Sequence, residues 1–283
     1  MTLADDLRRP PSHKMVTPAK VLTFDIERRP GVYLEWAPRN QGFMGRDKQL
    51  IRSSTISFSA KWYDQRGTIY HAIAPVDSMF MQPEDVPGYR EMLVALYDLL
   101  NQADIVVGFN SARFDQAKVL GEFARLGLGE PSPFRTLDIM RTTKRMGWDY
   151  SSLAETLSAL GLEGKLAHQG FQLWVDFLRG DPKAHRTMEK YNRQDVVQTE
   201  RAMDALRPYI KDHPNLGLWA GQDDNGDPLR VCPKCASPDL HIILQKDAAT
   251  ALTRYPLYSC GKCGTRDIRG NHVKERVSVR TAR

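Results

Sequence analysis

The chain has 283 residues, 41% of them hydrophobic and 26% charged, which is typical of a globular protein with room for one large and one small domain. No apolar run approaches the roughly 18 residues that a membrane-spanning helix needs, so we expect no membrane partner. The net charge is +6; residues 229–283 hold 11 Lys and Arg against 4 Asp and Glu, while the first 228 residues hold 29 against 30. This basic C-terminal end favours a polyanionic partner such as nucleic acid.

The first 19 residues are polar and contain three prolines, which predicts a mobile N-terminal arm at 1–19. They lack the apolar segment of a signal peptide, so we expect the protein in the cytoplasm.

Residues 20–212 alternate between strand and helix signals. Period-two patterns and apolar runs predict strands at 21–27, 55–63, 67–74 and 104–110. Apolar residues at three- and four-residue intervals, together with a Ser152/Glu155 capping box, predict helices at 89–103, 111–127, 152–161 and 186–206. Strands followed by strand–helix alternation predict one layered α/β (α+β) domain over 20–212.

All four cysteines follow this domain, in the pairs CPKC and CGKC, with 24 residues between the pairs. In a reducing compartment two CxxC pairs are typical of a tetrahedral zinc site, and the spacer has room for a β-hairpin. We therefore predict a zinc ribbon at 230–270 with one structural Zn²⁺. Its ligands are expected to be Cys232, Cys235, Cys260 and Cys263. Prolines and glycines predict a linker at 213–229 before it, and a basic tail follows at 271–283.

The role of the ribbon stays open at this point. It is either a metal staple that folds a small domain, or a contact surface for nucleic acid or for a replication or repair protein. Exposed positive charge would favour nucleic acid. The basic residues concerned are Lys234, Arg254, Lys262, Arg266, Arg269 and those of the tail KERVSVRTAR.

Acidic side chains recur at the ends of predicted elements. In VLTFDIE, Asp25 and Glu27 project from one face of a strand. Either a divalent cation lies between them, which would offset the cost of burying two carboxylates, or the strand ends at Asp25 and both are solvated. In VVGFNSARFD, Asp115 stands at the start of a helix, and in YNRQD, Tyr191 and Asp195 share one helix face.

Together these segments supply four carboxylates, enough for two hard cations. Their order, D-x-E, then N-x3-F-D, then Y-x3-D, resembles the motifs of the DnaQ-like 3′–5′ exonucleases, the DEDD group of the RNase H-like superfamily. The tyrosine form matches the DEDDy subgroup, since the histidine form needs His where this chain has Lys190. The resemblance spans residues 20–212, includes GLEGK-x2-H-x-G (161–170), and looks closest to the PolB-like branch of phage and bacterial proteins. Arg28 departs from it, because many relatives have threonine after D-x-E.

The resemblance implies a mixed β-sheet flanked by helices, with two Mg²⁺ (or Mn²⁺) ions held by Asp25, Glu27, Asp115 and Asp195. Asp25 would bridge both ions, and Tyr191 would orient the attacking water. The implied reaction is hydrolysis of nucleic acid from a free 3′ end, with DNA favoured over RNA and nucleoside 5′-monophosphates released. The implied location is the cytoplasm of a bacterium or of a phage-infected host.

Other residues of these motifs have supporting roles. Asn110 and Phe114 belong to the second motif, and we expect Phe114 to pack in the core, with a substrate contact as the alternative. Phe24 is also expected in the core, because it faces away from Asp25. Lys165 and His168 are expected to approach phosphate or to serve only as loop residues, and neither is assigned to catalysis.

Two further functions remain open. One is a structure-specific RNase H-like endonuclease that cuts branched DNA, and the Y-x3-D motif argues against it. The other is a zinc-ribbon nucleic-acid-binding protein with an inactive nuclease body, and the intact set of acids argues against that.

Overall fold

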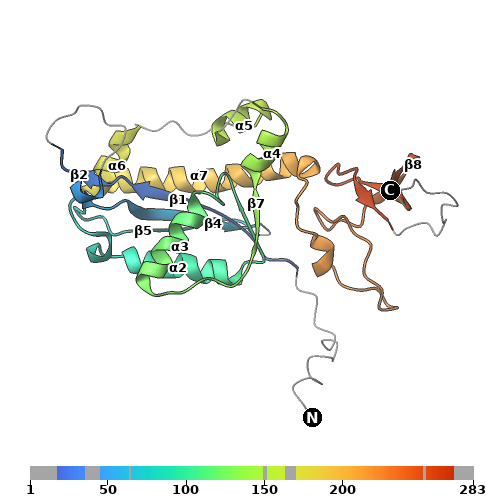
Figure 1. Cartoon of the computed structure of the whole chain (residues 1–283), viewed down its shortest axis with the longest axis horizontal. Helices are drawn as coiled ribbons and strands as arrows, with labels where there is room; N and C mark the ends of the chain where they lie inside the picture. The colour runs from blue at the N-terminus through green and yellow to red at the C-terminus, as the bar shows by residue number, and fades with distance from the viewer. Residues whose placement is uncertain are drawn as a thin grey trace, which may run out of the picture. The chain divides into compact units, whose positions relative to one another are not determined.

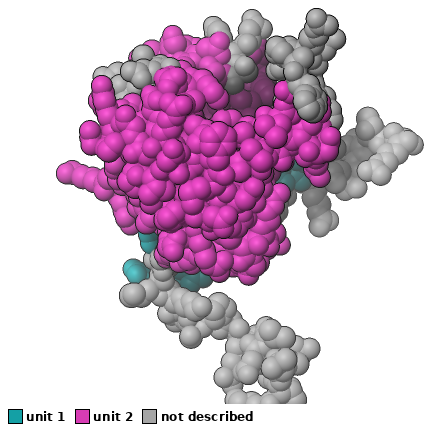
Figure 2. All heavy atoms as spheres, turned by 90° about the vertical axis from the view of Figure 1, so that its left-hand side faces the viewer, with its two compact units in different colours: residues 1–19, 213–283 teal, residues 20–212 magenta. Residues whose placement is uncertain are grey.

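The computed structural model describes residues 18–35, 45–63, 65–148, 152–162, 170–250 and 253–270. The chain forms two compact units, one comprising Lys20–Asp212 and the other comprising Met1–Ala19 and His213–Arg283 (Figures 1 and 2). No helix within the described ranges combines the length and apolar character that crossing a membrane requires.

Three parts of the sequence prediction lie outside the described residues. They are all but the last two residues of the expected arm at 1–19, the loop that contains Lys165 and His168, and the basic tail at 271–283.

A five-stranded mixed sheet forms the centre of the larger unit, with the strand order β5-β4-β1-β6-β7. β1 (Val21–Arg29) is the middle strand, antiparallel to β4 (Ser54–Trp62) and parallel to β6 (Ile105–Gly108). β5 (Ile69–Ala72) pairs antiparallel with β4, and β7 (Arg135–Asp138) pairs parallel with β6. A separate two-stranded sheet joins β2 (Val32–Tyr33) and β3 (Gln49–Ile51).

Helices cover both faces of the five-stranded sheet, so the predicted mixed α/β fold is confirmed. The α-helices are α2 (Tyr89–Gln102), α3 (Asp115–Leu126), α4 (Ile139–Arg145), α5 (Leu153–Ala159), α6 (Phe171–Leu178) and α7 (Pro182–Leu206). In Figure 1, α7 runs along one side of the sheet while α2 and α3 lie along the other. Short 3-10 helices lie at η1 (Arg46–Lys48), η2 (Pro83–Asp85) and η3 (Arg207–Tyr209).

Two helix starts differ from the sequence prediction. α3 begins at Asp115 and not at 111, because residues 111–114 form a turn, in which the N–H of Phe114 donates to Asn110 O. α7 begins at Pro182, four residues earlier than expected, because the side chain of Asp181 accepts the N–H groups of Lys183 and Ala184. Such an acidic cap followed by proline is a favourable helix start. The sequence prediction lacked β7, α4 and α6.

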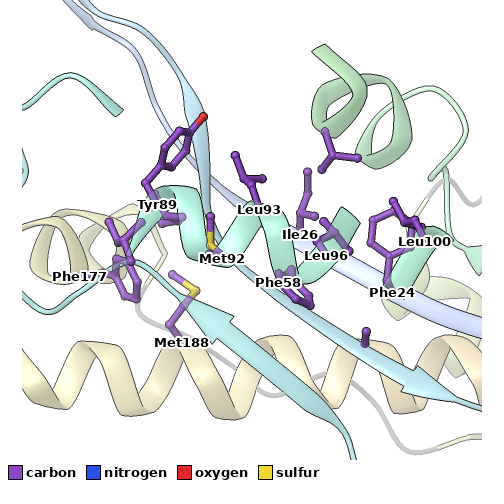
Figure 3. Packing of buried hydrophobic residues seen from close by; sticks show 14 of the residues in the cluster. Phe24, Ile26, Phe58, Tyr89, Met92, Leu93, Leu96, Leu100, Phe177 and Met188 are labelled. Carbon is purple, nitrogen blue, oxygen red and sulfur yellow. The ribbon is translucent and has the colours of Figure 1, made fainter. Parts of the chain in front are cut away.

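The two faces of β1 differ in chemistry. Leu22, Phe24 and Ile26 are at most 4% exposed and belong to one apolar cluster with residues of β4 and α2. Figure 3 shows Leu93 and Leu96 of α2 in this cluster. The alternating residues Thr23, Asp25 and Glu27 point to the other face, which α7 covers.

A buried ion pair joins α3 to the sheet. Glu122 is 1% exposed, and its Oε1 accepts from Arg28 Nη1 at 2.6 Å and from the backbone N–H of Thr55 at 3.1 Å. Arg28, the residue that departs from the exonuclease motif, therefore has a structural partner. Glu122 lies two helical turns after Asp115, so this contact also fixes the helix that carries Asp115.

The smaller unit contains a three-stranded antiparallel sheet with the order β10-β9-β8. Its strands are β8 (Leu240–Ala249), β9 (Arg254–Cys260) and β10 (Ile268–Arg269). β8 and β9 form the hairpin expected between the cysteine pairs. The expected linker at 213–229 contains the 3-10 helix η4 (Leu216–Trp219) and a bridge between Gln222 and Pro228.

Glu122→Ala should lower the free energy of unfolding by about 3–5 kcal/mol, because it leaves the guanidinium of Arg28 buried without its carboxylate. Urea denaturation of the full chain measures this loss. Asp212→Ala is the matched control, since the Arg145–Asp212 pair has side chains that are 44% and 75% exposed. It should cost less than about 1 kcal/mol. Equal losses of unfolding free energy in the two variants would contradict a stabilising role for the Arg28–Glu122 pair.

Candidate functional site

Three acidic side chains meet between β1 and α7. One carboxylate oxygen from each of Asp25, Glu27 and Asp195 lies within 4.8 Å of the others. Asp25 and Glu27 project from the polar face of β1, and Asp195 is 4% exposed on α7. β1 continues to Arg29, so the alternative in which the strand ends at Asp25 is wrong.

Asp115 lies beside this cluster. Its Oδ1 accepts the backbone N–H of Ile26 at 3.2 Å, between the two acids of β1. It is outside the trio of mutually close acids that the described residues form. The pKa of Asp115 is raised to about 7, mainly by burial and to a smaller extent by the nearby carboxylate of Asp138, while the hydrogen bond from Ile26 acts in the opposite direction. Without a cation, Asp115 therefore holds a proton far above the usual pH range of a carboxyl group.

Asn192 joins the strand acids to α7. Its Nδ2 donates to Asp25 Oδ2 at 2.7 Å, and its Oδ1 accepts from Ser57 Oγ at 3.4 Å. The sequence analysis did not identify Asn192 as a site residue. In the sequence, only its position beside Tyr191 in the Y-x3-D segment indicated a role in the site.

The turn after β6 presents the second motif. Gly108 is required there, because a Cβ would lie 2.2 Å from the Cβ of Ser111. Asp138 accepts the backbone N–H of Asn110 at 2.8 Å and caps α4. The sequence analysis did not identify this residue either. The expectation that Phe114 packs in the core is wrong, since its side chain is 43% exposed. It precedes the first residue of α3, where the turn directs the ring to the surface.

Tyr191 lies on α7 one turn before Asp195 and is 8% exposed. Trp174 of α6 packs edge-on against its ring, with centroids 6.4 Å apart and an interplanar angle of 76°. The sequence did not reveal this contact, because α6 was not predicted.

The acid cluster has the donor chemistry of a site for a hard cation. Carboxylate oxygens are the ligands that Mg²⁺ and Mn²⁺ prefer, and a bound cation would lower the cost of keeping neighbouring carboxylates ionised. Three negative charges this close repel one another strongly in a partly buried position. Asp25, Glu27 and Asp195 therefore fit a divalent metal, with Asp115 placed to add a fourth carboxylate.

The four cysteines of the smaller unit also converge. Their sulfur atoms lie within 4.8 Å of one another, with 3.7 Å between Cys232 and Cys263 and 3.6 Å between Cys235 and Cys260. Zinc with Zn–S bonds of ~2.3 Å in a tetrahedron would separate its sulfurs by ~3.8 Å. The sulfur positions therefore fit the Zn²⁺ that the CxxC spacing predicts.

The two cysteine pairs have the same backbone conformation. The N–H of Cys232 donates to Ser237 O and that of Cys260 to Thr265 O, at 2.8 and 2.7 Å. The residue after each pair has a positive φ, 55° at Ala236 and 73° at Gly264. Each pair is thus a tight turn that directs two thiol groups to one point.

The charge on the smaller unit differs from the expectation at one residue. Lys234 is 6% exposed, and its Nζ lies 3.3 Å from Asp267 Oδ1, so its charge is neutralised within the unit. Arg254, Lys262, Arg266 and Arg269 are exposed.

Comparison with known proteins finds one family model. Residues 76–207 match the RNase H superfamily, a range that runs from before α2 to the end of α7. It includes Asp115, Tyr191 and Asp195, whereas β1 lies before it. The mixed sheet flanked by helices is consistent with that superfamily. No curated protein sequence matches the chain.

Among solved structures, the chain is similar to the family B DNA polymerase from the hyperthermophilic archaeon Pyrobaculum calidifontis, with 17% sequence identity and a TM-score of 0.49. The similarity covers 86% of this chain and 33% of the polymerase chain, so the present chain spans about a third of that protein.

The raised pKa of Asp115 predicts a pH effect on stability in protein dialysed free of Mg²⁺ and Mn²⁺. The unfolded chain releases this proton near pH ~4, whereas the folded chain keeps it to about pH 7. The folded state binds more protons in this window, so its stability should fall as pH rises, by at most about 1.4 kcal/mol per unit. Urea denaturation at pH 5 and pH 7 measures the fall, which Asp115→Asn should reduce. Identical pH slopes in the two proteins would contradict the raised pKa.

Proposed function

We propose that the unit Lys20–Asp212 is a metal-dependent 3′–5′ exonuclease that hydrolyses phosphodiester bonds of nucleic acid and releases nucleoside 5′-monophosphates. The observation that carries the proposal is the convergence of Asp25, Glu27 and Asp195, with Asp115 hydrogen-bonded beside them. The match of residues 76–207 to the RNase H superfamily supports a nuclease.

The acids have distinct parts in this proposal. Asp25, Glu27 and Asp195 would hold the Mg²⁺ or Mn²⁺ ions, and Asp115, which lies beside them, would add a fourth carboxylate. When bound, such ions act as Lewis acids that stabilise charge on the phosphate and activate the attacking water. Asp115 must lose its proton to take part, and the positive charge of a cation lowers the cost of that ionisation.

Tyr191 and Phe114 would act on the other reactants. A phenol with an ordinary pKa near ~10 is a poor base at neutral pH, so Tyr191 would orient the attacking water by hydrogen bonding. Trp174 limits the movement of its ring. Phe114 presents an exposed ring directly before Asp115, where a nucleotide base could stack on it.

We further propose that the smaller unit is a zinc ribbon whose exposed Arg254, Lys262, Arg266 and Arg269 contact the phosphate backbone. Four thiolates complete a tetrahedral zinc site, so the metal is structural and not catalytic. The burial of Lys234 removes one charge from this surface.

Asp195→Ala should lower the rate of nucleotide release by at least about 10³-fold, because metal charge stabilisation worth several kcal/mol depends on the cluster. Tyr191→Phe should lower it by about 10²-fold without loss of metal binding. The assay uses Mg²⁺ or Mn²⁺ with DNA or RNA labelled at either end, single-stranded, duplex or branched. Glu189→Ala is the control, since Glu189 is a partly exposed acid of α7 that pairs with Arg193.

The products distinguish the alternatives. A ladder of mononucleotide steps from the 3′ end supports the exonuclease. A single internal cut in branched DNA would instead identify an endonuclease. Binding without cleavage by metal-loaded protein would identify an inactive nuclease body. Full activity in Asp195→Ala would refute the proposed site.

Loss of zinc should unfold the smaller unit and leave the larger unit folded. Its described apolar cluster consists mainly of the cysteines with Ile268, Leu240 and Tyr258, too little to fold a unit without the metal. Zinc analysis should give one Zn²⁺ per chain in wild-type protein. Cys260→Ser should lose zinc and make the smaller unit sensitive to protease, while Ser259→Ala should do neither. Unchanged protease resistance in zinc-free protein would contradict a folding role for the metal.

A further inference from the structure

We propose that Asn192 is a positioning residue, which orients the carboxylate of Asp25 for cation binding. The inference rests on the metal site proposed above. Asn192 is fully buried on α7, directly after Tyr191 and three residues before Asp195. Residues 25 and 192 are 167 positions apart, yet their side chains are in hydrogen-bond contact.

The chemistry of the two groups fixes the direction of this contact. An ionised carboxylate only accepts hydrogen bonds, so the amide nitrogen of Asn192, and not its oxygen, must face Asp25. The distance from Nδ2 to Asp25 Oδ2 is 2.7 Å, and the distance to the backbone oxygen of Asp25 is 3.3 Å. The amide oxygen faces away and accepts from Ser57 Oγ at 3.4 Å. Both ends of the amide are therefore held.

This arrangement uses a small part of the bonding capacity of Asp25. The N–H of Asn192 contacts Oδ2 alone, and an ionised carboxylate can accept several hydrogen bonds or metal contacts through its two oxygens. The donor is neutral, so it satisfies the buried part of the carboxylate without supplying a positive charge that would compete with the metal. A lysine or arginine at this position would neutralise Asp25 instead.

The hydrogen bond also sets the position of α7 relative to β1. Ser57 lies opposite Glu27 in the β1–β4 pairing, so the amide contacts both strands beneath the helix. Tyr191 and Asp195 lie on the same helix, so the position of α7 also determines where their side chains lie. Partners of this kind typically change metal affinity by about 10–100-fold when they are removed.

Two substitutions test the role in the zinc-loaded, 283-residue chain. Asn192→Ala removes the amide, and Asn192→Leu keeps a side chain of similar size without a hydrogen-bond donor. We expect each to weaken Mn²⁺ binding by about 10–100-fold, measured by calorimetric titration, and to raise the Mn²⁺ concentration for half-maximal activity by a similar factor. Ser57→Ala should weaken binding less, because the donor remains.

Thr143→Ala is the control for a merely structural role. Thr143 is fully buried on α4, and its Oγ1 donates to Met140 O at 3.0 Å, outside the acid cluster. Its loss should lower stability and leave Mn²⁺ affinity unchanged. If Asn192→Ala does not fold, Asn192→Leu decides the question.

The outcomes separate this inference from the proposed function. If wild-type protein binds Mn²⁺ and a folded Asn192 variant binds it equally well, the positioning role is refuted and the metal site stands. If wild-type protein binds no Mn²⁺ in the acid cluster, the proposed function and the positioning role are both refuted.

Discussion

The structure of the larger unit depends on β1, the middle strand of its sheet, whose two faces differ in chemistry. Leu22, Phe24 and Ile26 supply apolar contacts on one side of β1, while Asp25 and Glu27 lie on the other. A shift of one residue in the pairing of β1 would place the carboxylates in the apolar core. The core thus fixes the register of the strand, and the register places the acids under α7.

The neighbouring strand is adapted to this polar face. In the β1–β4 pairing, Asp25 lies opposite Ser59 and Glu27 opposite Ser57, and both serines are fully buried. Small side chains there leave space beneath α7 for the carboxylates and for the amide of Asn192. α3 is held to the same strands by Glu122, so every acid of the candidate site stands on a regular element. Such elements hold catalytic groups more rigidly than loops do.

Sequence reasoning identified the elements that carry a periodic pattern, an apolar run or a capping box. β6 has only four residues and α5 seven, but β6 is a continuous apolar run and α5 begins with a capping box. β7 and α4 are equally short and have neither signal, so they were missed. Asp25, Glu27 and Asp195, which form the cluster, were all predicted as site residues from the order of the three sequence motifs. Asn192 and Trp174 were missed because their roles come from contacts between distant segments. The error at Phe114 arose from hydrophobicity alone, since the turn before α3 directs the ring outward.

The two clusters of metal-binding residue types reach their geometry by different routes. Within each cysteine pair the geometry is local, because backbone hydrogen bonds across five residues turn both thiols inward, and only the β8–β9 hairpin is needed to join the pairs. The spacing of cysteines in the sequence therefore predicts the site directly. The carboxylates come from β1, α3 and α7, so their convergence needs the complete apolar core of the larger unit. We expect that core to form without a cation, whereas the apolar residues around the cysteines are too few to fold the smaller unit alone. An ion at the acids would therefore add chemistry to a unit that is already folded, while an ion at the cysteines would be part of the fold itself.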